Sequence, residues 1–269
     1  MATTKIQLKE LGPRLPLGIP GPDGKLQKDI ACKPWRGREE REVGQLRGES
    51  RDEGDFPTKL LAYMFERVGH HDFTAMTMPE REVVISQMFF GDGLYAYVWL
   101  RTQCIGDQLK LDLTCPNCSF EFKYEADLGT IEVRSAEDLD AVQWEYDLKH
   151  PFEIRGKEAT GFELAPSRWS TIHRASKHAL ETGVVNPNAT KMEIMQSCIA
   201  GISGVGPAVL TSNELDDMTK LDIEGLAGKI DEHEIGPDMM VSEKCPRCRR
   251  RFRVSLDWDY ASFFESSSQ

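Results

Sequence analysis

The sequence predicts an α+β fold in which two duplicated lobes, each a hairpin plus helices, are joined by a ribbon that carries four cysteines. The motif Cys-Pro-x-Cys occurs twice, first at Cys115 and Cys118 and again at Cys245 and Cys248. In each half the motif follows segments with the apolar spacing of helices and precedes alternating apolar residues. Several other residues recur at nearly the same separation, which indicates an internal repeat.

Size, charge and apolar pattern limit the classes of function. The chain has 269 residues, of which 40% are hydrophobic, so it can bury two modest cores. Its formal charge of −11 disfavours a general polyanion binder, because a net negative field repels phosphate backbones. The longest apolar stretches are interrupted at residues 91–93 and are shorter than the roughly 20 residues that span a bilayer. The N-terminal residues lack a secretory pattern, so we expect a reducing cytoplasm with cysteines as thiols or metal ligands.

The composition along the chain predicts its division into segments. Residues 1–55 are rich in glycine, proline and charge, which is typical of an extended arm, and Asp23-Gly24 predicts a hairpin turn within it. The expected segments are an arm at 1–55, a first helical lobe with one cysteine knuckle at 56–130, an acidic linker at 131–143, a second lobe with hairpin, helices and knuckle at 144–264, and a tail at 265–269.

The first lobe changes from helical to strand periodicity along its length. Apolar residues within 56–68 recur on one face of an amphipathic helix. Residues 77–80 (Thr-Met-Pro-Glu) form a capping box that begins a second helix, and a third helix is expected after Gly91-Asp92 through about Arg101. Alternating apolar residues at 109–113 and 120–124 then predict a strand on each side of the first knuckle.

The second half repeats these features in the same order. A hairpin over residues 144–164, turning at 155–157, opens it. Two features recur at one common separation: Trp35 with Trp169, and the capping box with residues 211–214. A second, slightly shorter separation relates Ile105-Gly106 to Ile235-Gly236, the first knuckle to the second, Phe122 to Phe252, and Asp127 to Asp257. An ancient duplication with a short deletion between box and knuckle accounts for this agreement.

The four motif cysteines, Cys115, Cys118, Cys245 and Cys248, are the predicted metal ligands. Zn²⁺ takes four thiolates in a tetrahedron, and each Cys-x-x-Cys turn supplies two of them while its N–H groups donate to the sulfurs. The proline after each first cysteine fixes φ and removes an N–H that would need a partner. The sequence therefore predicts a structural zinc ribbon whose two knuckles share one site.

Two other chemical interpretations of the cysteines stay open. In thiol–disulfide oxidoreductases the first cysteine of Cys-Pro-x-Cys begins a helix, whose dipole lowers the thiol pKa. The alternating aromatic residues after the first motif favour a strand instead. The second alternative to zinc is that the four cysteines are thiols without a metal. We expect no catalytic residues, because His173 and His178 are five apart and miss the i, i+4 spacing of two ligands on one helix face.

A cluster of basic residues surrounds the second knuckle and has three interpretations. The cations could offset the −2 formal charge of a four-thiolate zinc centre, meet an acidic partner surface, or bind nucleic acid. Few aromatic residues lie among these basic residues, which disfavours nucleic-acid binding. The cluster consists of Lys244, Arg247, Arg249, Arg250, Arg251 and Arg253.

The order of these features resembles a known family. A hairpin around Gly-Lys, a helical pair, an Ile-Gly step, Cys-Pro-x-Cys with alternating aromatics and a closing Phe263-Phe264 are similar to baseplate hub assembly proteins of contractile-tailed bacteriophages and related injection systems. Residues 146–264 also resemble tail assembly chaperones. Many such knuckles continue with glycine, whereas this chain has Ser119 and Arg249, so its turns must tolerate a side chain.

The resemblance implies a non-enzymatic, zinc-binding protein of the phage tail or baseplate, acting as a hub component or an assembly factor. Its partners would be other phage tail or baseplate proteins, with neither nucleic acid nor membrane as a target. Its location would be the host cytoplasm during assembly, and the virion tail or baseplate if it stays in the particle. The alternatives are a zinc-ribbon nucleic-acid-binding protein and a CxxC thiol–disulfide oxidoreductase.

Overall fold

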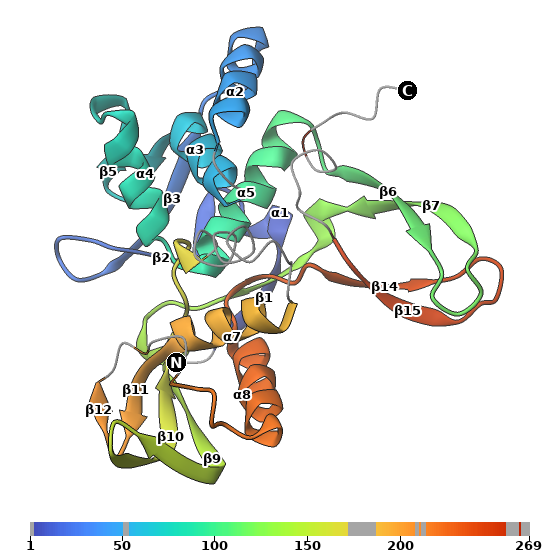
Figure 1. Cartoon of the computed structure of the whole chain (residues 1–269). Helices are drawn as coiled ribbons and strands as arrows, with labels where there is room; N and C mark the ends of the chain where they lie inside the picture. The colour runs from blue at the N-terminus through green and yellow to red at the C-terminus, as the bar shows by residue number, and fades with distance from the viewer. Residues whose placement is uncertain are drawn as a thin grey trace.

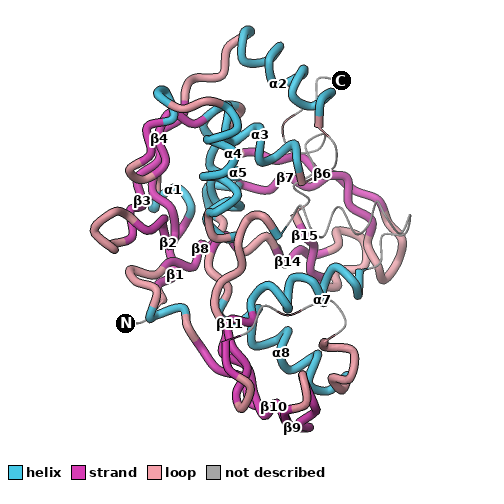
Figure 2. Tube along the Cα trace, turned by 60° about the vertical axis from the view of Figure 1, so that its left-hand side comes forward, coloured by secondary structure: helices cyan, strands magenta, loops and turns pink. Residues whose placement is uncertain are grey.

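The chain adopts a mixed α+β fold. The computed structural model describes residues 3–50, 54–171, 187–207, 210, 214–256 and 264, with the backbone alone at 187–191 and 207. In Figures 1 and 2 the helices of the first half lie together, and a second lobe of strands and helices lies below them. No helix in the described part of the chain is long and apolar enough to cross a membrane.

The first sheet is antiparallel, and its strands follow one another in chain order. They are β2 (Arg14–Pro20), β3 (Leu26–Cys32), β4 (Phe65–Val68) and β5 (His71–Asp72). The predicted turn at Asp23-Gly24 joins the first two, and Gly24 has φ +77°, a conformation that costs glycine little. Between β3 and β4 the chain forms α2 (Gly37–Glu49) and α3 (Asp55–Met64).

Two further helices complete the core of the first half. In α4 (Met78–Gln87) the predicted capping box is confirmed, since the N–H of Thr77 donates to the Glu80 carboxylate at 2.7 Å. The helix α5 (Phe90–Cys104) is buried continuously over residues 91–101, so it is surrounded by neighbours. A side chain at Gly93 would meet the Trp169 ring, with 2.2 Å from its Cβ to Cε3.

The second half builds another four-stranded antiparallel sheet in chain order. Its elements are β9 (Trp144–Ile154), β10 (Lys157–Leu164), α7 (Pro187–Cys198), β11 (Ile199–Ser203), β12 (Gly206–Pro207) and α8 (Lys220–His233). The predicted hairpin and its turn are confirmed, with Arg155 at φ 55° and Gly156 at φ 74°. Phe162, Leu226 and neighbouring apolar residues form a separate core between this sheet and its helices.

A small third sheet joins segments that are far apart in the sequence. Its order is β1 (Thr4–Gln7), β8 (Glu132–Ser135) and β13 (Gly236–Pro237). The short helix α1 (Leu8–Leu11) and the 3-10 turns at Leu128–Thr130 and Asp140–Val142 flank it, and a third 3-10 turn lies at Phe73–Ala75. The start, middle and end of the chain are therefore held together by backbone pairing.

Four strands form the ribbon. The first hairpin is β6 (Gln108–Thr114) with β7 (Glu121–Asp127), and the second is β14 (Met240–Lys244) with β15 (Arg251–Ser255). Figure 1 shows both hairpins side by side, projecting from the body. The strands predicted on each side of the first knuckle are confirmed.

The structure corrects the expectation of an extended arm at residues 1–55. The described part of this segment is folded, and Leu15, Leu17 and Val43 are fully buried. Alternating leucines in β2 supply an apolar face, which becomes stable once the α5 helix covers it. The abundant glycine and proline mark turns between these short elements.

The structure also corrects the expectation of a solvated acidic linker at residues 131–143. Its first part, β8, is the central strand of the third sheet, and Val133 is fully buried there. Because side chains alternate along a strand, the charged Glu132 faces outward while its neighbour packs inward. The helix expected over 56–68 ends early at Met64, because residues 65–68 pair with β3 as β4.

Some features named from the sequence lie outside the described residues. They are residues 211–213 of the second capping box and Asp257 of the repeat, together with His173, His178, Phe263 and the tail at 265–269. The described helix α8 is capped by Thr219, whose hydroxyl accepts from the N–H of Asp222 at 3.2 Å.

Candidate metal centre

Both knuckles have the same backbone geometry. In the first, the N–H of Cys115 donates to the carbonyl of Phe120 at 3.0 Å, and the N–H of Ser119 donates to the carbonyl of Cys115 at 2.9 Å. In the second, the N–H of Cys245 donates to the carbonyl of Arg250 at 3.0 Å, and that of Arg249 to the carbonyl of Cys245 at 2.9 Å. Each motif therefore closes one tight turn between two strands.

The residue after each second cysteine has a left-handed conformation. Ser119 has φ 53° and Arg249 has φ 61°. A residue with a Cβ loses roughly 1–2 kcal/mol there, a penalty that glycine avoids. The turns tolerate a side chain, as the sequence required, but at a cost in stability.

Packing between the hairpins brings the knuckles together. The rings of Phe122 and Phe252 meet edge to face, with centroids 6.3 Å apart. This contact joins β7 to β15 across the ribbon. The two cysteine turns at the same end of the hairpins consequently lie opposite each other.

The four predicted ligands form one cluster. The Sγ atoms of Cys115 and Cys248 are 3.7 Å apart, as are those of Cys118 and Cys245, and all four lie within 4.8 Å of one another. A Zn–S bond of about 2.3 Å implies sulfurs about 3.8 Å apart in a tetrahedron. A disulfide would instead need about 2.05 Å, so this spacing fits a shared metal ion and four separate sulfurs.

Burial and hydrogen bonds act in opposite directions on the pKa values of the clustered cysteines. Burial opposes ionisation of Cys115, but N–H groups at Asn117 and Cys118 and the cysteines of the second knuckle lower its pKa below the ordinary value. For Cys118, the N–H of Phe120 lowers the pKa, but burial and the other three cysteines raise it more. Four thiolates this close need a positive ion among them to share one site.

The geometry disfavours the oxidoreductase interpretation. Cys115 follows strand β6 and Cys245 follows strand β14, so neither thiol lies at the start of a helix, where a dipole would lower its pKa. The other cysteines are apart from the cluster, and burial raises the pKa of Cys32 to about 11 and of Cys198 to about 12. Raised pKa values keep these two thiols protonated near neutral pH, and a protonated thiol is a poor nucleophile.

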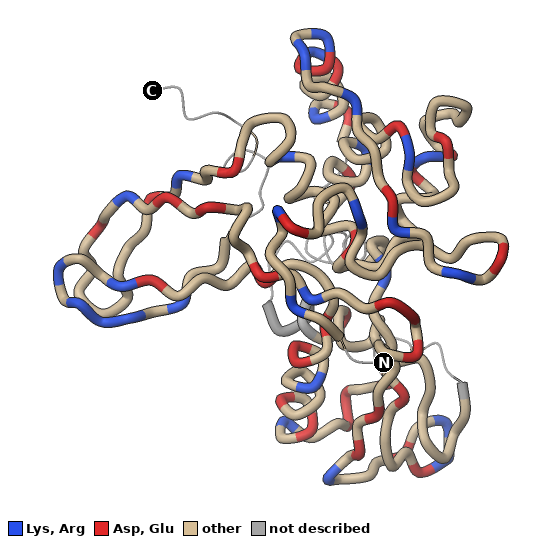
Figure 3. The backbone as a smooth tube through the Cα atoms, turned by 180° about the vertical axis from the view of Figure 1, so that it is seen from behind, with Lys and Arg blue, Asp and Glu red and all other residues tan. Residues whose placement is uncertain are grey.

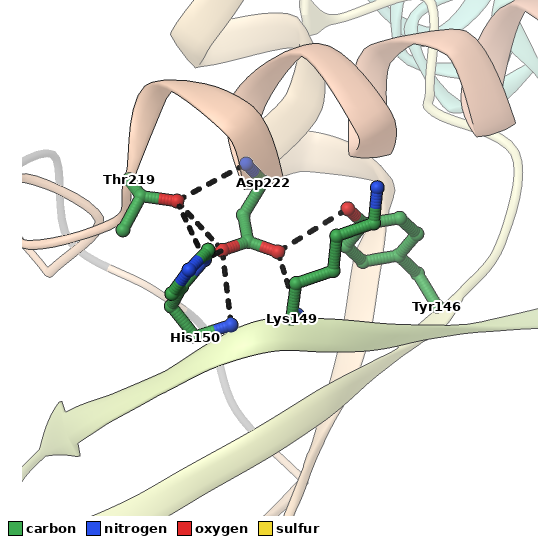
Figure 4. Close-up of polar contacts among 5 residues, drawn as sticks. All are labelled: Tyr146, Lys149, His150, Thr219 and Asp222. Carbon is green, nitrogen blue, oxygen red and sulfur yellow. Dashed lines mark hydrogen bonds and ion pairs between the residues drawn. The ribbon is translucent and has the colours of Figure 1, made fainter.

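A second polar cluster was not anticipated from the sequence. Asp222 is fully buried at the start of α8 and accepts from the N–H groups of Lys149 and His150 at 2.7 and 3.2 Å. The hydroxyls of Thr219 and Tyr146 reach it at 2.7 and 3.4 Å. Figure 4 shows these groups converging on one carboxylate. The Asp222 side chain thus fixes the hairpin strand β9 to the helix.

Threonine, histidine and aspartate meet here without the geometry of a catalytic triad. In a triad, the two imidazole nitrogens contact the aspartate and the nucleophile separately. Here Thr219 Oγ1 and Asp222 Oδ2 both lie near Nδ1 of His150, at 3.4 and 3.2 Å. The threonine hydroxyl is also occupied as a helix cap. The cluster has a structural role, which is to connect the start of α8 to strand β9.

In the first half, Asp92 connects helix α5 to strand β2 in the same way. It is fully buried in α5 and accepts from the N–H groups of Leu17 and Gly18 at 2.8 and 2.9 Å. Asp92 and Asp222 have the same separation along the chain as Cys115 and Cys245. A comparison of every residue with the one at this separation in the second half would have identified the two aspartates from the sequence.

Comparison with protein-family models, with curated proteins and with solved structures finds no match to this chain.

Proposed function

We propose that the four cysteines hold one structural zinc ion and that the chain is a non-enzymatic assembly protein acting through protein contacts. The observation that carries this is the cluster of four sulfurs within 4.8 Å. A closed four-thiolate shell leaves no open position for a substrate or an activated water, which is the pattern of structural zinc.

Zinc would supply a cross-link between two hairpins that are otherwise weakly held. Each hairpin is a separate two-stranded ladder, and such ladders are marginal alone in water. The ligands come from residues 115–118 and 245–248, so the ion would tie the end of the first half to the end of the second. The projecting ribbon would thereby become a rigid platform.

The proposal that the lobes arose by duplication has support from matching details. Both sheets have four strands in chain order. Just beyond the second strand of each, the N–H of Lys33 donates to the carbonyl of Met64 at 3.0 Å, and that of Ala165 to Cys198 at 2.8 Å. The Ile-Gly steps also agree, with Gly106 at φ +118° and Gly236 at φ +117°.

We further propose that the chain acts in the tail or baseplate of a contractile injection system, as a hub protein or an assembly factor. The resemblance noted in the sequence supports this setting, and a two-lobed body with a projecting ribbon suits a protein that positions partners. The partners would be other tail or baseplate proteins. It would act in the host cytoplasm during assembly and could stay in the particle.

Purified tails and their assembly intermediates test this function. Mass spectrometry should find the chain at a fixed ratio to a tail protein in at least one of them, and its deletion should stop assembly at that stage. Absence from every intermediate, together with normal tails after deletion, would show that the assembly role is wrong.

A further inference from the structure

The second hairpin of the ribbon carries a dense exposed positive charge. Side chains alternate along β15, so Arg251 and Arg253 face outward while Phe252 and Val254 face the first hairpin. Figure 3 shows Lys and Arg gathered at the far end of the ribbon. All the basic residues of this hairpin are exposed, and together they are named the basic face: Lys244, Arg247, Arg249, Arg250, Arg251 and Arg253.

These cations have no carboxylate partner in the part of the chain that the structure describes. Their recorded side-chain contacts are weak: Arg247 lies over the Phe120 ring at 5.9 Å, and Arg250 reaches the Asn117 amide oxygen at 3.5 Å. Elsewhere in the described chain some arginines do have a carboxylate partner, as Arg155 has in Glu214 at 3.0 Å. The basic face is thus left available to another molecule.

The first hairpin shows that the geometry of the turn does not require these cations. It has the same knuckle geometry, but it has Asn117, Ser119 and Glu121 at the positions where the second hairpin has arginines. Outward-facing Arg251 and Arg253 point away from the inner side of the ribbon. Compensation of thiolate charge therefore does not explain Arg251 and Arg253.

We propose that the basic face docks an acidic, extended segment of a partner protein. Guanidinium groups bind carboxylates through paired hydrogen bonds, and they keep their charge at all physiological pH values. In the described structure β15 pairs with β14 on one side, so its other edge can accept an added strand. The partner surface belongs to the assembly protein proposed above, and the assignment rests on that function.

The ribbon suits an acidic protein better than nucleic acid. Binding of single strands uses aromatic rings that stack on bases, but Phe120 and Phe122 stack on each other and Phe122 meets Phe252.

Peptide binding to the zinc-loaded full chain tests the assignment. The probe is a fluorescein-labelled peptide of alternating Glu and Val, followed by fluorescence anisotropy at low ionic strength. The double variant Arg251→Glu/Arg253→Glu should weaken binding by about tenfold or more, because it replaces attraction by repulsion. The matched control is Lys110→Glu/Lys123→Glu on the outer face of the first hairpin, and it should change affinity less than about twofold. Both variants should keep the metal content of the wild type.

Three results would overturn the assignment. They are no peptide binding at low ionic strength, equal weakening by both double variants, and tighter binding of single-stranded DNA than of the peptide through the same arginines. Recruitment to tail intermediates separates the two proposals. If Arg251→Glu/Arg253→Glu is recruited like the wild type, the docking surface is wrong and the assembly function stands. If the peptide binds through the arginines but the wild type is never recruited, the docking surface stands and the function is wrong.

Discussion

Asp92 and Asp222 are each the third residue of a helix, and each accepts two consecutive backbone N–H groups from the first strand of a hairpin. Both carboxylates are fully buried. An acidic group in the first helical turn also interacts favourably with the helix dipole. In each half, one side chain therefore sets where the helix begins relative to the sheet.

Removing either carboxylate should destabilise the chain. Asp222→Ala leaves the N–H groups of Lys149 and His150 without their acceptor, and we expect the free energy of unfolding to fall by about 2 to 3 kcal/mol. Asp23→Ala is the matched control, since Asp23 accepts one N–H in an exposed turn and should cost within about 0.5 kcal/mol. Urea titration of zinc-loaded protein measures both. Similar losses for the two variants would contradict a special role for Asp222.

The two aspartates should affect the pH dependence of stability in opposite directions. Burial raises the pKa of Asp92 to about 6, above its ordinary value of 3.8, although the N–H groups of Leu17 and Gly18 act against this. The folded state therefore binds the proton more tightly. Its contribution to stability is full below pH 3.8 and is lost as pH rises through about 6. The stability advantage of wild type over Asp92→Asn should fall by about 3 kcal/mol over that window.

Asp222 provides the comparison. Burial acts to raise the pKa of Asp222, but hydrogen bonds from Thr219, Lys149 and His150 outweigh it and lower the pKa below the ordinary value. Its contribution is present above that ordinary value and is lost as pH falls further. Unfolding curves of Asp222→Asn against wild type should show this opposite trend, and parallel pH profiles for both variants would contradict the assignment.

Each knuckle should be needed for the same metal ion. We expect metal analysis to find about one zinc per chain in the wild type and loss of that zinc in Cys115→Ser and in Cys245→Ser, because the three thiolates that remain in each variant make an incomplete shell. Cys104→Ser, which lies outside the cluster, should keep full metal content. A single-knuckle variant with unchanged zinc would show that the knuckles do not share a site.

The close approach of α5 to the third sheet makes Gly91 irreplaceable. A Cβ at Gly91 would lie 1.7 Å from the carbonyl oxygen of Ile235, and the backbone cannot yield cheaply. Gly91→Ala should lower the free energy of unfolding by about 3 kcal/mol or more. Gly228→Ala in α8 meets nothing within 4 Å and should stabilise by up to about 1 kcal/mol. Thermal unfolding compares the two, and equal shifts would contradict the close contact between α5 and Ile235.

The left-handed turn residue offers a stabilising substitution. Ser119→Gly should raise the free energy of unfolding by about 1 kcal/mol, because glycine relieves the Cβ strain at φ 53°. Ser242→Gly, in the extended strand β14 of the same ribbon, should instead lower it by about 0.5 to 1 kcal/mol. Chemical denaturation of the zinc-loaded chain measures both, and a loss of stability in Ser119→Gly would contradict the strain.

Local features were readable from the sequence, because each depends on neighbouring residues. The hairpin turn at Asp23-Gly24 follows from the backbone freedom of glycine. The helix start at Thr77 follows from a carboxylate three residues later. The grouping of the four cysteines was predicted from the spacing and chemistry of two short motifs, and the structure places their sulfurs together.

Contacts between residues far apart in the sequence decided the strand pairing and the burial of charged side chains. Residues 65–68 leave the helical pattern because β3 offers them a strand partner. Glu132–Ser135 becomes a central strand because β1 and β13 approach it from both ends of the chain. The burial of Asp92 depends on N–H groups 74 and 75 residues away. The sequence by itself determined the turns, the helix cap at Thr77 and the candidate metal-ligating cysteines. Tertiary structure decided which segments pair and which charges are buried, since those energies arise only between residues that folding brings together.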